Sequence, residues 1–160
     1  MTRTINEEEL ESRAEARSRM SGLEYMQKVA AGEVPQSGMG QLMGFKITEV
    51  SEGYAVLTVR PDDRHYNGIG IAHGGLAATL LDSATGCAIN TMMPAGRIFT
   101  TLEMKINYVR PIRGETGVVR CEARVIHVGG RVATAEGRVV DEQGKLYAHG
   151  TATCMLFQTR

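Results

Sequence analysis

The fold is decided by a run of small and apolar residues, HGGLAATLLDSATGCAINTMM, at positions 73–93. From Gly74 to about Met92 this run predicts one long helix with apolar side chains on nearly every face, which Pro94 ends. A helix that is apolar all round must be buried on most sides. Asp82 is its only charged residue, so the carboxylate needs hydrogen-bond partners, a raised pKa or access to water in a cleft.

Strand patterns surround this helix along the chain. Residues 45–50 and 54–60 predict a hairpin, and residues 118–128, 132–140 and 146–157 predict strands joined by tight turns. One long strand directly after the helix alternates at Ile98, Thr100, Leu102, Met104, Ile106 and Tyr108. The order of two strands, a buried helix and a four-stranded antiparallel meander predicts an α+β fold. In it, a curved antiparallel sheet wraps around one long central helix.

Residues 1–40 differ from the rest of the chain. Asn6 is placed to cap a helix that has acidic residues in its first turn and few apolar positions. A second helical piece puts four apolar residues on one face, namely Leu23, Met26, Val29 and Ala30. We therefore predict an N-terminal helical arm over residues 1–40, packed on the domain or on a neighbouring subunit, and one domain over residues 41–160.

The composition argues against several classes of protein. The 160 residues carry 18 Lys and Arg against 18 Asp and Glu, and 5% of them are aromatic, with no Trp. This balance disfavours binding to nucleic acid or to a membrane surface through bulk charge. An aspartate within the most apolar stretch also disfavours a transmembrane helix. Residues 1–19 lack the apolar segment of a signal peptide.

The three cysteines, Cys87, Cys121 and Cys154, lie far apart in the sequence. They form no CxxC motif, and they do not combine with histidines at the spacing of a metal site, so we expect no bound metal. An odd number of thiols in apolar surroundings predicts buried, reduced cysteines and hence a cytoplasmic protein.

The start of the long helix carries the candidate chemistry. A helix N-terminus presents unpaired backbone N–H groups, and the N–H of Gly74 or Gly75 could hold a carbonyl oxygen that gains negative charge. The alternative is that the two glycines only make a tight turn. Asp82 follows two turns later, about 11 Å along the axis, where a general base could share one groove with the donor. The alternative is a structural aspartate. We expect His73 to hold the loop by hydrogen bonds.

Arginines at strand ends are candidates for binding phosphate. Arg110 and Arg113 follow the long strand and Arg131 sits in a tight turn, although solvated turn charges would look the same. The chain has no Gly-x-Ser-x-Gly motif of a serine hydrolase, and residues 68–70 do not complete a dinucleotide-binding fingerprint.

The sequence resembles the PaaI-like acyl-CoA thioesterases of the hotdog fold. The likeness rests on Asn67, on the His73-Gly74-Gly75 motif and on Asp82, together with residues 100–111 and 144–150, and it covers residues 41–157. It implies the hotdog fold with an N-terminal helical extension. It also implies a homodimer or a dimer-based homotetramer whose active sites lie between subunits.

The resemblance also implies roles for individual residues. Asp82 would be the catalytic carboxylate, either a general base or a nucleophile, and Gly74 would polarise the thioester carbonyl through its N–H. Asn67 would act from the other subunit, and His73 would orient the loop. The Thr101 hydroxyl, or alternatively that of Thr100, would position the water, and Gly75 would contact the substrate. Arg113 and Arg131 would bind the phosphates of coenzyme A. Leu80 and Leu81 would lie beside an apolar acyl pocket.

The implied function is hydrolysis of an acyl-CoA thioester to a free acid and coenzyme A. Because coenzyme A enters as part of the substrate, the resemblance implies no separate cofactor. Two alternatives remain open: a non-catalytic acyl-CoA binding or regulatory hotdog protein, and a hotdog hydratase or dehydratase. A base together with an oxyanion donor favours the hydrolase. No motif in the sequence indicates which acyl group is preferred.

Overall fold

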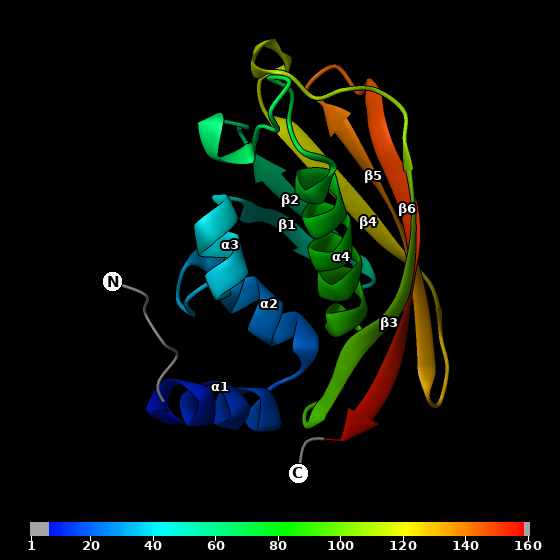
Figure 1. Ribbon diagram of the computed structural model, residues 1–160. Helices are drawn as coiled ribbons and strands as arrows, with labels where there is room; N and C mark the ends of the chain where they lie inside the picture. The colour runs from blue at the N-terminus through cyan, green and yellow to red at the C-terminus, as the bar shows by residue number, and fades with distance from the viewer. Residues whose placement is uncertain (1–6, 159–160) are drawn as a thin grey trace.

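The computed structural model describes residues 7–158 and confirms the predicted architecture (Figure 1). A six-stranded antiparallel sheet curves around the central helix α4, which spans Gly74–Thr91. The strands are β1 (Lys46–Ser51), β2 (Tyr54–Val59), β3 (Arg97–Tyr108), β4 (Val119–Val128), β5 (Val132–Asp141) and β6 (Leu146–Gln158). Three N-terminal helices precede the sheet: α1 (Glu7–Arg19), α2 (Gly22–Ala31) and α3 (Gly38–Met43). Two short 3-10 turns lie at Asp63–His65 and Gly114–Thr116.

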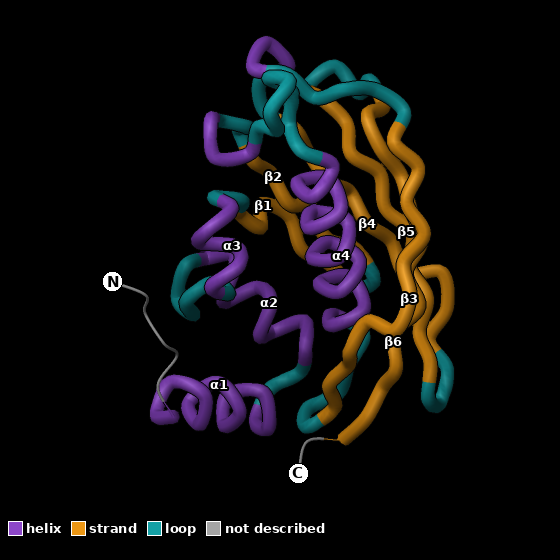
Figure 2. Tube along the Cα trace, in the orientation of Figure 1, coloured by secondary structure: helices purple, strands orange, loops and turns teal. Residues whose placement is uncertain are grey.

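The strand order β1-β2-β4-β5-β6-β3 corrects the predicted four-stranded meander. Of the four strands that follow α4, only β4, β5 and β6 are neighbours in chain order, and β3 pairs with β6 at the edge of the sheet. The reason is the crossing of α4 over the concave face, which carries the chain from β2 to the far edge (Figure 2). The place beside β2 is thereby left for β4, and the second edge of β3 stays unpaired among residues 7–158.

The core lies between α4 and the concave face of the sheet. Leu76, Leu80 and Leu81 are at most 1% exposed and pack against buried residues of β2 and β4 such as Leu57. Each fully buried leucine contributes about 1.5–3 kcal/mol. Small residues between the leucines bring the helix close to the sheet, so one face of α4 packs across the core.

A bulge in β3 overturns the alternation predicted for that strand. The pairing of β3 with β6 shifts between Thr101 and Glu103, so Leu102 is an extra residue and its side chain is 58% exposed. An inserted residue reverses which side chains face inward beyond it. Phe99 and Thr101 are therefore partly covered before the bulge, and Met104 is partly covered after it.

Helix α2 is fixed against the carboxyl-terminal end of α4. The Gly22 N–H donates a 2.8 Å hydrogen bond to the Met93 carbonyl, and a Cβ at Gly22 would lie 1.7 Å from the Asn90 carbonyl oxygen. Only glycine permits this approach. Ser21 and Glu24 form a capping box at the start of α2, a pattern that is visible in the sequence but was not used in the prediction.

The buried face of α2 differs in part from the prediction. Met26 is buried as expected, but Tyr25 is its buried companion, and Ala30 is exposed. The predicted cap at Asn6 lies outside the described residues. The boundary predicted between residues 40 and 41 stays a prediction, while contacts of α2 with α4 and β1 place part of the arm on the domain of the same chain.

Candidate active site

The entry to α4 is fixed by His73. Its ring Nδ1 accepts a 2.8 Å hydrogen bond from the Gly75 N–H, and its own N–H donates to the His65 carbonyl at 2.7 Å. The first bond caps the helix and the second ties the loop to the preceding turn. His73 therefore holds this loop by hydrogen bonds, as the sequence led us to expect.

The structure distinguishes the two glycines. The Gly75 N–H is occupied by His73, whereas the Gly74 N–H has no hydrogen-bond partner among residues 7–158. A Cβ at Gly74 would lie 3.2 Å from Cε1 of Tyr108, so the tyrosine ring lies directly over this glycine. An unpaired N–H at the positive end of a long helix can stabilise a developing oxyanion. Gly74 is thus the candidate donor of the pair.

Asn67 lies in the same place through a turn of its own loop. Its Oδ1 accepts the N–H groups of Ile69 and Ile71 at 3.1 and 3.4 Å, so that side of the amide is used locally. The amide nitrogen takes no part in these bonds and remains available as a donor. A cavity of about 340 Å³ is lined by Asn67, His73, Gly74 and Tyr108, among others. No carboxylate is among its lining residues.

Asp82 lies on a mostly buried helix but is itself exposed in the single chain, so its carboxylate has the access to water that the sequence left as one possibility. The sheet covers the leucine face of α4, but Asp82 lies on a flank of the helix that faces the start of β3 and the arm. Its Oδ1 accepts a 2.8 Å hydrogen bond from the Thr101 hydroxyl. This contact orients the carboxylate and leaves its second oxygen open to water.

The bulge in β3 explains why Thr101 and not Thr100 reaches Asp82. Thr101 precedes the inserted Leu102 and is partly covered, whereas Thr100 is exposed. The side chains of adjacent residues in a strand point to opposite faces, so only one threonine can face the helix. Thr100 therefore does not share the Asp82 site within this chain. The Thr101 hydroxyl also accepts a long contact from the Cys154 thiol at 3.8 Å.

Asp82 lines a second cavity, of about 240 Å³. Its walls come from α4, β1, β3 and the arm, and the apolar lining consists of Tyr25, Met26, Val29, Pro35, Phe45, Ile47, Gly86, Cys87 and Phe99. Leu80 and Leu81, which we expected beside an acyl pocket, are instead buried in the core. Their position on α4 turns them toward the sheet. The arm residues of this lining were not predicted from the sequence, because nothing local shows that α2 packs on α4.

Cys87 lies in the Asp82 cavity but is a poor candidate for a nucleophile. Burial is the main cause that raises the pKa of this thiol to about 12, with Asp82 raising it further and the positive charge of Arg17 opposing both. The thiolate is the reactive form of cysteine. The carboxylate of Asp82 is therefore the candidate reactive side chain in this cavity.

The two cavities have no lining residue in common, which corrects the prediction of a single groove. Eight residues separate Gly74 from Asp82 on α4, and a rise of 1.5 Å per residue makes that about 12 Å along the axis. One carbonyl group cannot contact both. Each of these two cavities thus contains one part of the catalytic groups. The Gly74 cavity contains the hydrogen-bond donors, and the Asp82 cavity contains a carboxylate with a hydroxyl.

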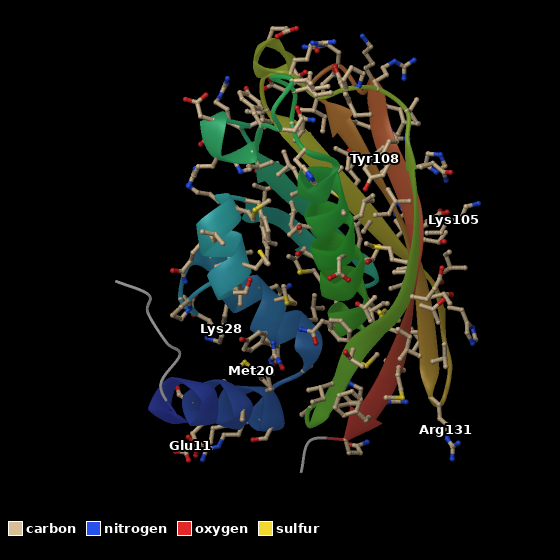
Figure 3. All side chains as sticks on the ribbon, in the orientation of Figure 1. Glu11, Met20, Lys28, Lys105, Tyr108 and Arg131 are labelled. Carbon is tan, nitrogen blue, oxygen red and sulfur yellow. The ribbon has the colours of Figure 1, made fainter. Side chains whose placement is uncertain are left out.

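A basic cleft adjoins the Gly74 cavity. It has a volume of about 420 Å³ and shares Arg110, Pro111 and Tyr147 with that cavity. Its charged lining residues are three cations and two carboxylates: Arg110, Arg113, Lys145, Glu115 and Asp141. Asp141 accepts the Lys145 N–H at 2.9 Å and thereby fixes the turn that carries this lysine. Arg131 lies at the opposite end of the sheet from Tyr108 (Figure 3), so Arg113 and Arg131 do not share a site in one chain.

Residues 7–158 contain no group of three or more His, Cys, Asp or Glu side chains that could hold a metal ion. Over the same residues, no helix has the length and apolar character needed to cross a membrane.

The chain is similar in sequence and fold to known proteins. A protein of Halobacterium salinarum named as a candidate esterase is 32% identical over 87 residues, which are 51% of this chain and 58% of that protein. The chain thus matches less than two thirds of that relative's length.

Two solved structures share the fold. A mutant of the phenylacetic acid degradation protein PaaI from Thermus thermophilus superposes with a TM-score of 0.67 at 32% identity, over 74% of this chain and 98% of that one. The Streptococcus mutans protein smu.793, bound to acetyl-CoA, superposes with a TM-score of 0.66 at 25% identity, over 72% of this chain and 90% of that one.

The profile of the thioesterase superfamily matches residues 69–148, which include the His73-Gly74-Gly75 motif and Asp82. The chain therefore belongs to the thioesterase superfamily and has the hotdog fold, as its sequence predicted.

Proposed function

We propose that the protein hydrolyses acyl-CoA thioesters to a free carboxylic acid and coenzyme A. The observation that carries this proposal is the 2.8 Å hydrogen bond from Thr101 to Asp82 at an open cavity, in a chain of this superfamily. A carboxylate held by a hydroxyl and open to water is suited to general-base catalysis. A purely binding protein needs no such base, and no observation favours a hydratase.

In the proposed reaction, Asp82 accepts a proton from a water molecule while that water attacks the thioester carbonyl carbon. The carbonyl oxygen gains negative charge, which the Gly74 N–H and the Asn67 amide stabilise. The carbon–sulfur bond then breaks, and the thiolate of coenzyme A leaves and takes a proton from solvent or from the protonated Asp82. Thr101 acts as a positioning residue because its hydroxyl orients the carboxylate.

We propose that two chains complete each active site. The Gly74 donors and Asp82 lie in separate cavities of one chain, so a second copy must bring its donors to the first copy's carboxylate. The unpaired edge of the 12-residue strand β3 is a suitable surface, since long open edges are rarely left exposed and Leu102 and Tyr108 on it are each 58% exposed. The proposed assembly is a homodimer or a homotetramer made of such dimers.

The nucleotide part of coenzyme A is assigned to the basic cleft beside the Gly74 cavity. Arg110, Arg113 and Lys145 offer charge-assisted hydrogen bonds to phosphates there. The acetyl-CoA bound to the Streptococcus mutans protein supports a coenzyme A thioester as the ligand. No further cofactor is needed for hydrolysis, and a cytoplasmic location, where acyl-CoA thioesters are available, stays a prediction.

The test is release of free thiol from a panel of acyl-CoA thioesters, with Asp82→Asn as the matched inactive variant. Turnover by the wild-type chain that the variant loses would support the proposal. Binding without any turnover would indicate the regulatory alternative. After a single turnover in ¹⁸O-labelled water, label in the Asp82 carboxylate would identify it as the nucleophile, because water must then have added to the Asp82 carbonyl of an anhydride intermediate.

A further inference from the structure

The cavity that contains Asp82 ends at a thin partition. Four residues line both this cavity and a second groove of about 500 Å³ on its outer side, namely Val29, Pro35, Gln36 and Ile47. The second groove is otherwise lined by the end of α2, the following turn and the start of β1. These four residues, which we call the partition, are all that the two spaces have in common.

The partition is built mainly by the N-terminal arm, which lies outside the part of the chain matched by the superfamily profile. Val29 comes from α2, and Pro35 and Gln36 come from the segment that joins α2 to α3. Only Ile47 belongs to the sheet, in β1, where it packs against the core. The shape of this wall is therefore a property of the arm.

Several contacts hold the partition in place. The Gln36 side chain donates a hydrogen bond to the Phe45 carbonyl, and the Gln36 carbonyl accepts one from the Gln41 side chain at 2.9 Å. Helix α2 is itself anchored by the close approach of Gly22 to Asn90 at the end of α4. The wall consequently has a fixed distance from Asp82, which lies on the same helix as Asn90.

The space on the Asp82 side is an open cavity of limited volume. A water molecule takes up about 30 Å³ of liquid volume and a methylene group is of similar size, so a cavity of about 240 Å³ holds about eight such groups. Its lining is mostly apolar, which suits a hydrocarbon chain and not a charged one. Only Arg17 and Asp82 are charged among the residues that line it.

We propose that the partition sets the maximum acyl-chain length of the enzyme, with Val29 as the specificity-determining residue. This inference rests on the proposed function, because it places the thioester carbonyl at Asp82 and the acyl group in the adjoining cavity. Acyl groups of up to about eight carbons fit between Asp82 and Val29, and longer chains meet the wall. Removing the Val29 side chain opens a path into the outer groove.

The experiment compares Val29→Ala and Val29→Phe with wild type on butyryl-, hexanoyl-, octanoyl- and dodecanoyl-CoA. We expect Val29→Ala to raise the ratio of kcat/KM for dodecanoyl-CoA to that for butyryl-CoA at least about tenfold. We expect Val29→Phe to lower the ratio for octanoyl-CoA to butyryl-CoA by a similar factor, because methylene groups in an apolar pocket each discriminate by tenfold or more. The matched controls, Val132→Ala and Val132→Phe, change a valine that is 40% exposed on another part of the sheet and should leave both ratios unchanged.

A binding measurement separates this inference from the proposed function. Calorimetry with non-hydrolysable S-alkyl-CoA thioethers of four to twelve carbons on the Asp82→Asn chain reports the length limit without catalysis. Hydrolysis with ratios that neither Val29 variant alters would overturn the partition's role and leave the thioesterase intact. A length limit that moves with Val29 on the Asp82→Asn background, together with a wild-type chain that hydrolyses none of the thioesters, would support the partition and reject the hydrolase. Failure of every thioether to bind would overturn the acyl pocket itself.

Discussion

The two parts of α4 that carry candidate chemistry are built in different ways. At its start, the reactive group is the backbone N–H of Gly74, and its surroundings come from the adjacent loop through His73 and Asn67. Two turns later the reactive group is the Asp82 side chain, and its surroundings come from Thr101 on β3 and from the distant arm. The first is ordered mainly by local hydrogen bonds, with Tyr108 of β3 covering it, and the second exists only because distant segments pack together. Substitutions at the two places should therefore fail in different ways.

The largest effect is expected at Asp82. Asp82→Asn keeps the size of the side chain and can still accept the Thr101 hydrogen bond, but it cannot take a proton from water. Loss of a general base costs about 10²–10⁴-fold, and we expect turnover to fall by at least this factor. Because Asp82 is exposed in the single chain, the melting temperature should change little. Thiol release and thermal denaturation measure the two quantities.

A folded, fully active Asp82→Asn enzyme would contradict the mechanism. The matched control is Asp63→Asn, which changes an exposed aspartate in the Asp63–His65 turn and should alter neither turnover nor substrate binding.

At the other end of the helix, Asn67→Ala should reduce kcat by about 10²-fold, since removal of one oxyanion donor costs about 10²–10³-fold. The loop should also loosen, because Asn67 accepts two of its N–H groups. Asn67→Asp keeps an acceptor for both bonds but removes the amide donor, and its kinetics separate the two roles.

Subunit complementation sharpens the comparison between the two cavities. If each site uses Asn67 of one chain and Asp82 of its partner, chains with Asn67→Ala and chains with Asp82→Asn should restore about a quarter of the wild-type sites when assembled at random as dimers. The measurement is thiol release by co-refolded or co-expressed chains. Activity no higher than that of the separate variants would place both residues in the site of one chain.

A smaller effect is expected at Thr101. Thr101→Val removes the hydroxyl that orients Asp82 while keeping the shape of the side chain, so we expect kcat to fall about tenfold with little change in KM. Thr101→Ser should restore the bond and most of the rate. The neighbouring Thr100→Val is the control, because this side chain is exposed and does not contact Asp82. Equal losses for the two valine variants would refute the orienting role.

The smallest effect concerns the arginines. Arg113→Ala should raise the KM for acyl-CoA severalfold with kcat nearly unchanged, because a charge-assisted contact to phosphate is lost. The factor is modest because the Arg113 side chain is 51% exposed and solvent screens its charge. Arg131→Ala tests the opposite end of the sheet by the same measurement. A larger rise in KM for Arg131→Ala than for Arg113→Ala would indicate that the phosphates bind at the Arg131 end of the sheet.

Much of the fold followed from local patterns. The small apolar run after the His73 motif predicted α4 within one residue of its end, and all six strands were expected within one or two residues of their observed bounds. The predicted position of β3 in the sheet was wrong, because the sequence pattern of a strand does not indicate which strands it pairs with. The site was less predictable: the Gly74 turn and Asp82 were identified, but the arm that lines the Asp82 cavity was not.

The sequence by itself determined the elements and the candidate chemistry, because propensity, capping and hydrophobic periodicity act over a few residues. It could place a glycine pair at a helix start and one carboxylate two turns later. Only the tertiary structure decided that Thr101 and not Thr100 meets Asp82, since a single bulge at Leu102 sets which face each threonine occupies. It likewise decided that α2 lines the Asp82 cavity, because the close approach of Gly22 to Asn90 brings together segments nearly 70 residues apart in the sequence.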